Sequence, residues 1–241
     1  MIETEVQVTT PDGVMPTFVF HPEHDGPHPV VLYLMDAPSV RPALRDMASR
    51  LASAGYYVML PYLYYRGGPY REFGQSDEEM HRRRELMDTI TLENIVGDAD
   101  ALLAVSGADP AASDGAVGAV GFCMSGPLVI ALARARPERV AAVASIHGAR
   151  LVRDTDDSPH RGLDRVRAEV YLAWCDPDVS APAETIPVMR AALEAAGVRH
   201  AIDVITTAPH GFAPAGERYD RAASELHWER VHSLLRRNLG G

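Results

Sequence analysis

The sequence predicts an α/β protein whose mostly parallel sheet carries helices on both faces, preceded by an antiparallel hairpin. Short apolar runs alternate with helix-like segments, which is the pattern of a parallel sheet with crossover helices. Several of these runs are apolar throughout, as strands buried on both faces are. The chain has 241 residues and no recognisable repeat or linker, so we expect a single domain, 1–241.

The first half of the chain is expected to hold the hairpin, two central strands and two helical regions. A Pro-Asp-Gly turn at 11–13 separates two strand-like segments, which is a hairpin pattern. In order, the predicted elements are strands 5–10, 15–20 and 29–35, a helix 41–54, a strand 56–60, a loop 61–74 and a helix. The segment 76–79 opens that last helix as a capping box does, and the helical pattern continues to about Val105.

The second half of the chain repeats the alternation of strand and helix. In order, the predicted elements are a strand 117–123, a helix to about 136, a strand 140–146, a polar segment 150–167, a strand 170–174, a helix 183–196, a strand 200–205 and a final helix 217–239. The carboxyl ends of parallel strands share one edge of a sheet. We therefore expect functional side chains in the loops that follow the strands.

One turn between strand and helix places a thiol among small residues, in Gly121-Phe122-Cys123-Met124-Ser125-Gly126. So sharp a turn needs small neighbours, and it pushes its central side chain out at the top of the sheet. The pattern expected there is Gly-x-nucleophile-x-Gly, but Ser125 occupies the second glycine position and Gly126 follows it. A buried structural cysteine is the alternative interpretation of Cys123.

A catalytic thiol needs a base and an acid that orients the base. Among ten histidines, His210 lies in a loop just beyond the last predicted strand, and neighbouring Pro and Gly residues constrain that loop. Asp176 and Asp178 both follow strand 170–174, and Asp176 is the one that could instead cap the turn after it. The chain order is then nucleophile, acid, histidine, as in proteins of the α/β-hydrolase type.

These motifs together resemble the dienelactone hydrolase family, a cysteine-using branch of the α/β-hydrolase fold. The resemblance rests on the turn around Cys123, on Asp-Val-Ser-Ala-Pro at 178–182 and on Pro-His-Gly-Phe at 209–212. It implies Cys123 as nucleophile, His210 as base and Asp178 as the orienting acid. In the family a proline follows the acid by four positions, which favours Asp178 over Asp176.

The resemblance also implies an oxyanion hole and an activating acid. The expected backbone donors are the N–H of Met124, just after the nucleophile, and that of Ala37, after the third predicted strand. The family places a glutamate in this second loop, where it helps generate the thiolate. Asp36 occupies that position with a side chain one methylene shorter, and a loop cap is its alternative role.

Further residues are predicted near the substrate. Arg66 is a candidate for binding a substrate anion and Tyr64 for lining an apolar pocket, each with a plain structural role as the alternative. His147 ends another central strand and is expected to border the pocket. The predicted function is hydrolysis of a small ester or lactone through a thioester, with no metal and no cofactor.

Composition narrows the partners and the compartment. Lys and Arg number 23 against 33 Asp and Glu, a net charge of −10 that disfavours nucleic-acid and anionic-membrane binding. The two cysteines indicate no disulfide framework, and the acidic start of the chain contains no apolar signal segment. We expect a cytoplasmic protein that is a monomer or a homodimer.

Two other functions remain open at this point. Glutamine amidotransferases also place a cysteine on such a turn and use a downstream His-x-Glu, which His227-Trp228-Glu229 supplies here. That string lies in a predicted helix, which disfavours it as part of a site at the strand ends. A non-catalytic ligand-binding protein with the same fold is the second alternative.

Overall fold

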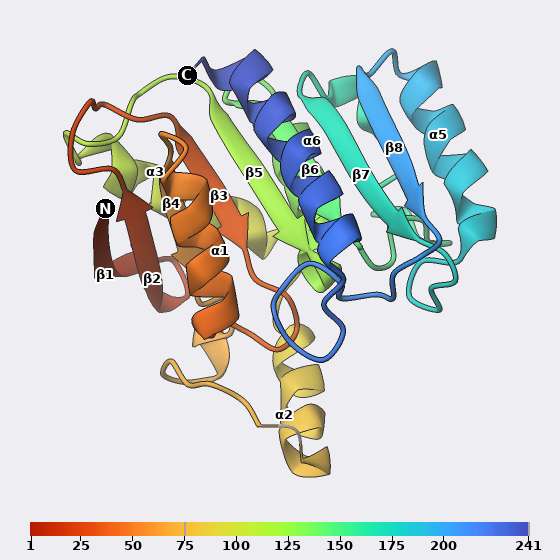
Figure 1. Ribbon diagram of the computed structural model, residues 1–241, viewed down its shortest axis with the longest axis horizontal. Coiled ribbons are helices and arrows are strands. Elements are labelled where there is room, and N and C mark those ends of the chain that lie inside the picture. Colours follow the sequence, from red (N-terminus) through yellow and green to blue (C-terminus); the bar gives the residue numbers. More distant parts are fainter. Residues whose placement is uncertain (75, 241) are drawn as a thin grey trace. The chain divides into compact units, whose positions relative to one another are not determined.

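The computed structural model describes residues 1–74 and 76–240. The chain divides into two compact units, Met1–Gly115 and Ala116–Gly241, which we call the N-terminal and C-terminal units. In Figure 1 the colours from red to yellow-green follow the first unit and those from green to blue follow the second. This division does not test the single domain that the sequence predicts, which stays a prediction.

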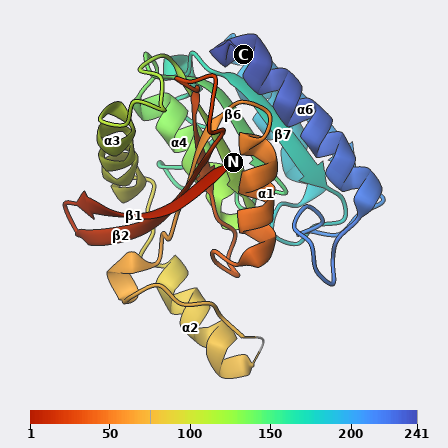
Figure 2. The same ribbon diagram turned by 60° about the vertical axis from the view of Figure 1, so that its left-hand side comes forward.

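The N-terminal unit contains strands β1 to β4, in the spatial order β1-β2-β4-β3. Its elements are β1 (Ile2–Thr10), β2 (Gly13–His21), β3 (Val30–Leu34), α1 (Pro42–Ala52), β4 (Tyr57–Pro61), the 3-10 turn η1 (Tyr65–Gly67), α2 (Asp77–Met87) and α3 (Asn94–Gly107). The predicted hairpin is confirmed, because β1 and β2 pair antiparallel, and β3 pairs parallel with β4. Figure 2 shows β1 and β2 side by side as a long ribbon.

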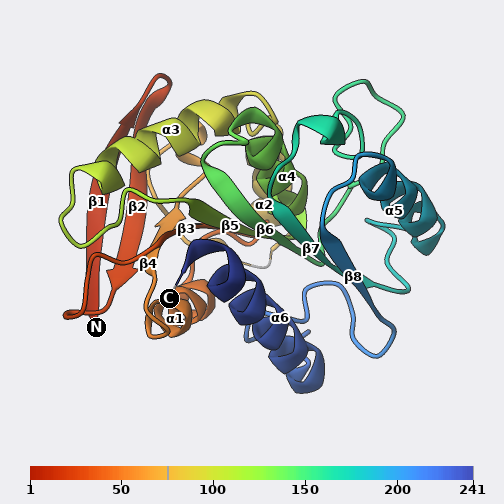
Figure 3. The same ribbon diagram turned by 90° about the horizontal axis from the view of Figure 1, so that it is seen from above.

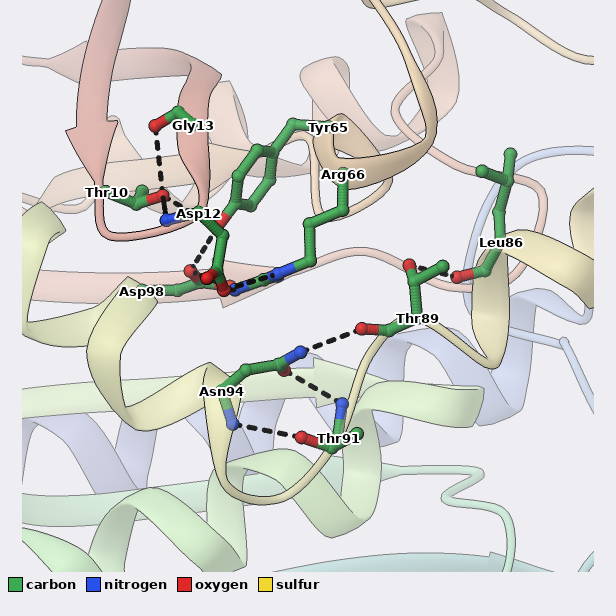
Figure 4. A network of polar contacts seen from close by, with 10 residues as sticks. All are labelled: Thr10, Asp12, Gly13, Tyr65, Arg66, Leu86, Thr89, Thr91, Asn94 and Asp98. Atoms are coloured by element: carbon green, nitrogen blue, oxygen red, sulfur yellow. Dashed lines mark hydrogen bonds and ion pairs between the residues drawn. The ribbon is translucent and has the colours of Figure 1, made fainter.

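The predicted helix from 76 to about 105 is wrong in one respect, because the chain leaves the helix between α2 and α3. Its start is right: the Ser76 hydroxyl accepts a hydrogen bond from the Glu79 N–H. The break follows from polar side chains that bond to the backbone in place of helical partners. Asn94 and Thr91 each bond the other's backbone N–H, at 2.9 and 3.0 Å, and Asn94 also donates to the Thr89 carbonyl (Figure 4).

The C-terminal unit contains a parallel sheet with the strand order β5-β6-β7-β8. Its elements are β5 (Val117–Phe122), the 3-10 turn η2 (Cys123–Ser125), α4 (Gly126–Ala135), β6 (Val140–Ile146), the 3-10 turn η3 (Leu163–Arg165), β7 (Glu169–Cys175), the 3-10 turn η4 (Ala183–Thr185), α5 (Ile186–Ala195), β8 (His200–Ile205) and α6 (Arg221–Leu239). The last helix begins four residues later than predicted, because the Asp220 side chain caps it through the Ala223 N–H.

Helices cover both faces of the strands in each unit, as the sequence predicts. In the C-terminal unit α4 packs on β5 and β6 from one face, and α6 packs on β5, β6 and β7 from the other (Figure 3). Strands β5 and β7 are buried along their whole length, which explains their continuous apolar sequences. Since β5 to β8 are parallel, the loops after them meet at one edge of this sheet. Among residues 1–74 and 76–240, the helices are too short or too polar to cross a membrane.

Candidate active site

Cys123 lies on a strained turn directly after β5. Its backbone φ is +53°, which a residue with a β-carbon rarely adopts and which costs about 1–3 kcal/mol unless the surroundings hold it. The turn is held from the loop after β6, since the Cys123 carbonyl accepts a 2.9 Å hydrogen bond from the Ala149 N–H. The side chain of Cys123 stays partly exposed. The sequence prediction of a sharp strand-to-helix turn is met in this geometry.

The two glycines of the turn are required by close backbone approach. A β-carbon at Gly121 would lie 2.3 Å from the Ser125 carbonyl oxygen. A β-carbon at Gly126 would lie 2.4 Å from the Ser145 hydroxyl oxygen and 2.6 Å from the Gly148 α-carbon. Ser125 is itself fully buried. The need for a small residue on the helix side therefore falls on position 126, which accounts for the shift of the second glycine by one place.

His210 and Asp178 are in direct contact. The Nδ1 of His210 lies 2.6 Å from the Asp178 Oδ2, and their side chains are 17% and 2% exposed. The other carboxylate oxygen of Asp178 accepts a 2.8 Å hydrogen bond from the Ser180 N–H, so both oxygens are oriented. The nearby Asp176 instead joins the sheet edge, where its N–H donates to the Ile205 carbonyl at 3.0 Å. The carboxylate that contacts His210 is that of Asp178.

The neighbours of His210 raise its pKa. Burial lowers this pKa, but hydrogen bonds and charge from Cys123 and then from Asp178 outweigh burial and raise the pKa to about 9. The imidazole thus lies between a sulfur and a carboxylate, and both favour its protonated form.

His147 follows β6 and lies beside His210. Its ring centroid is 5.0 Å from that of His210 and 5.3 Å from that of Phe212. The residue is buried, and its N–H donates to the Ala173 carbonyl of β7 at 2.8 Å. The structure places His147 against the histidine of the candidate site, although its predicted contact with substrate stays a prediction.

Asp36 and Ala37 belong to a loop of the N-terminal unit that is held at two points. The carboxylate of Asp36 forms a two-pronged ion pair with Arg41, at 2.6 and 2.9 Å. The Ala37 carbonyl accepts a 2.9 Å hydrogen bond from the Tyr64 hydroxyl. Tyr64 is fully buried, so its side chain supports this loop. Met124, the other predicted oxyanion donor, is the second residue of η2.

Arg66 lies in a polar network of the N-terminal unit (Figure 4). Its guanidinium donates to both oxygens of the buried Asp98, at 2.9 and 3.0 Å, and to Asp12 at 2.8 Å. The Tyr65 hydroxyl donates to the same Asp98 carboxylate at 2.6 Å. These contacts join the turn η1 to the hairpin and to α3. They are contacts of the structural kind that was the alternative for Arg66, and its predicted contact with a substrate anion stays a prediction.

Some contacts around the site were absent from the sequence predictions. Arg41 as the partner of Asp36, and Ser180 as the donor to Asp178, are such cases. A signal for Arg41 existed, since a basic residue directly before a helix and five positions after a loop acid can reach back to it. The Ser180 contact is an Asx turn, and Asp followed two positions later by Ser permits such a turn.

The alternative based on His227 finds no support in the geometry. His227 is buried in α6 and packs against Phe122 and Phe212, with ring centroids 6.3 and 5.8 Å away. Glu229, the other member of the string, is exposed on the same helix. Within residues 1–74 and 76–240, no cluster of three or more His, Cys, Asp or Glu side chains has the arrangement of a metal site.

Known proteins are similar to this chain in both sequence and fold. A Synechocystis protein named "Putative carboxymethylenebutenolidase" is 28% identical over 226 residues, which cover 92% of this chain and 91% of that protein. A carboxymethylenebutenolidase from a Pseudomonas strain is 33% identical over 109 residues, or 45% of each chain.

The structural comparison confirms the predicted α/β-hydrolase fold. A crystal structure of dienelactone hydrolase from Anabaena variabilis matches with a TM-score of 0.71 at 20% identity, covering 99% of this chain and 98% of that one. The model of the dienelactone hydrolase family matches residues 15–239, which is nearly the whole chain. This chain is therefore a member of the dienelactone hydrolase family, a family of hydrolases that act on small molecules.

Proposed function

We propose that this protein hydrolyses a small ester or lactone with Cys123 as nucleophile, His210 as base and acid, and Asp178 as the orienting acid. The observation that carries the proposal is the contact of His210 with both other groups, which raises its pKa to about 9. A histidine protonated at neutral pH and paired with sulfur supplies a thiolate without an outside base.

In the first half of the reaction the Cys123 thiolate attacks the carbonyl carbon of the substrate. A carbon–sulfur bond forms, and the carbonyl electron pair moves onto oxygen. When the tetrahedral intermediate collapses, the carbon–oxygen bond to the leaving group breaks and the His210 imidazolium protonates the departing oxygen. The product of this half is a thioester on Cys123. With a lactone the leaving hydroxyl remains part of the bound acyl group.

In the second half the neutral His210 removes a proton from water. The resulting hydroxide attacks the thioester carbonyl, and the tetrahedral intermediate expels the Cys123 thiolate and releases a carboxylic acid. The thiolate–imidazolium pair is thereby restored. Asp178 keeps the same hydrogen bond to Nδ1 throughout, which holds the ring in one tautomer and one orientation.

The negative oxygen of each tetrahedral intermediate needs hydrogen-bond donors. In this proposal they are the backbone N–H groups of Met124 and Ala37. Removing one such donor typically slows an acyl transfer by about 10²–10³-fold. The Tyr64 hydroxyl supports the second donor indirectly, because it fixes the carbonyl of Ala37 and with it the loop.

Asp36 has a structural role in this proposal. Its carboxylate is fully engaged by Arg41, so it anchors the loop that carries Ala37. His210 then generates the thiolate, and an acid that switches on substrate binding is not needed. A cytoplasmic location, a monomeric or homodimeric state and the lack of a nucleic-acid partner stay predictions of the sequence.

The test is hydrolysis of a panel of aryl esters and unsaturated lactones by the wild type, by Cys123→Ala and by Cys175→Ala. We expect Cys123→Ala to lose about 10³-fold or more in kcat/KM, the usual cost of removing such a nucleophile. The matched control, Cys175→Ala, removes the other thiol and should stay within about twofold.

Full activity in Cys123→Ala would contradict the proposal. No turnover by the wild type on any ester, together with tight binding of one of them, would favour the ligand-binding alternative. Release of ammonia from glutamine would favour the amidotransferase alternative.

A further inference from the structure

The backbone at His147 is strained in a place that faces the candidate site. Its φ is +40°, although it carries a β-carbon, and the residue is 1% exposed. A side chain in this conformation persists only where its surroundings hold it, and such residues cluster at functional sites. A glycine would adopt the same backbone without strain. The ring of His147 is therefore the feature whose role needs an explanation.

The ring of His147 fills the space between the end of β5 and the loop that carries His210. Its centroid lies 5.0 Å from that of His210, with the ring planes at 59°. Phe212 contacts it edge-on at 5.3 Å, and Phe122 lies at 5.9 Å on the side of β5. The backbone N–H of His147 is fixed on the Ala173 carbonyl of β7. The position of the ring is thus defined from several elements of the C-terminal unit.

We propose that His147 is a positioning residue for His210. The ring of His147 holds the ring of His210 in line between Asp178 and Cys123. The hydrogen bond at Nδ1 fixes one end of the His210 ring, and the contact of the other end with Cys123 depends on how the ring is turned about that bond. A buried ring packed beside it restricts this motion, so the other side of the imidazole stays on Cys123. This inference rests on the proposed function, because it assigns the purpose of the contact from the role of His210.

The first readout is the rate at which iodoacetamide alkylates Cys123 at neutral pH, which needs no ester substrate. We expect His147→Ala to slow alkylation and lower kcat about tenfold each, with KM changed less than about twofold. Small displacements of a catalytic group cost this much or more. A purely structural role would lower Tm without this split between kcat and KM.

Two more variants test what the ring supplies. His147→Phe keeps a ring of similar width and should recover most of both rates, to within about threefold of wild type, because packing needs no ring nitrogen. His147→Gly keeps the positive φ without strain and should be impaired like His147→Ala. His232→Ala is the control, since its ring stacks on Trp228 in the same helix as His227 and does not contact His210.

The proposal is overturned if His147→Ala and His147→Gly retain wild-type alkylation and kcat. It is also overturned if His147→Phe is as impaired as His147→Ala, because the nitrogens would then matter more than the ring. If His147→Ala does not fold, the comparison of His147→Gly with His147→Phe decides by the same criteria. Failure of the proposed function is seen separately, as hydrolysis that survives in Cys123→Ala.

Discussion

Cys123 and Cys175 both stand at the carboxyl end of a parallel strand in the same sheet, yet their surroundings differ. Cys175 is the last residue of β7, is 1% exposed, and pairs in register with Ile205 of β8. Its pKa is raised to about 12, by burial and then by the charge of Asp178. Cys123 lies one residue past the end of β5, on a left-handed turn beside His210.

This difference in surroundings comes from one step along the backbone. A side chain inside a central parallel strand points into a layer of helices, where a thiol stays neutral and inert. A side chain on the turn that follows leaves that layer and meets the loops after the other strands. The same Asp178 charge raises the pKa of the Cys175 thiol and that of the His210 imidazole.

The largest expected difference is in the rate of alkylation of the two thiols. At pH 7.5 iodoacetamide should modify Cys123 at least about 10³-fold faster than Cys175, because alkylation requires a thiolate and solvent access. Peptide mass spectrometry of the native protein over time measures both rates. Unfolding in urea should bring the two rates to within a fewfold, which is the internal control. Equal rates in the native protein would break the comparison.

Substituting Asp178 and Asp176 one at a time tests whether the Asp178 carboxylate is the acid that acts on both His210 and Cys175. Asp178→Asn should lower kcat/KM about 10²–10³-fold, because the amide no longer holds the charged, correctly oriented imidazole. The matched variant Asp176→Asn should stay within about threefold. Hydrolysis of one aryl ester by both variants provides the measurement, and Asp178→Asn should also lower the pKa of Cys175. A larger loss in Asp176→Asn would reverse the assignment.

The raised pKa of His210 predicts a dependence of stability on pH. The folded protein binds this proton more tightly than the unfolded chain, whose histidine has a pKa of 6.5, against about 9 when folded. The contribution, about 3 kcal/mol, is complete below pH 6.5 and is lost as the pH rises from 6.5 through 9. Urea unfolding at several pH values measures it. The wild type should lose more stability across this window than His210→Asn does.

This pH window also sharpens the comparison of the two thiols. Cys123→Ala removes one of the groups that raise the pKa of His210, so the upper end of the window should move down. Cys175→Ala should leave the window unchanged. A window that is the same in both variants would contradict the pairing of His210 with Cys123.

The smallest effect is expected at Asp36. If His210 alone generates the thiolate, Asp36→Asn should lower kcat about threefold to tenfold by loosening the loop, and alkylation of Cys123 should be unchanged. Arg41→Met, which removes the other half of the ion pair, should match it in kcat. Parallel kinetic and alkylation assays make the comparison. A fall in the alkylation rate in Asp36→Asn alone would restore the activating role that the family resemblance implies.

Much of the fold followed from local sequence. The strands 140–146 and 200–205 were predicted with the bounds that β6 and β8 have, because apolar patterning and β-branched residues act over a few neighbours. In the region from 76 to 105 the local pattern predicts one helix, but the structure has two. The mutual capping of Thr91 and Asn94 outweighs the helical pattern at the break.

Some candidate site residues could likewise be predicted from local sequence, and others depended on tertiary contacts. Cys123 and His210 could be proposed from their places after apolar runs, since parallel strands bring such places to one edge. The residues of the turn alone leave Asp176 and Asp178 both open, because two residues in one turn differ only in where the backbone aims them. The family resemblance favours Asp178, and the Asp178 carboxylate is the one that contacts His210. The pairing of Arg66 with Asp98 was equally hidden, since 32 positions separate the two residues along the chain.

For this protein, then, residue order alone was sufficient for the alternation of strands and helices, the position of the turn at Cys123 and the order of the three candidate groups. Those features depend on patterns within a few residues. How the Asp178 carboxylate meets His210, and why the second glycine stands at 126, depended on contacts between distant segments. Such contacts arise only when β5, β6, β7 and the loop after β8 pack together, because close packing leaves each side chain one place to go.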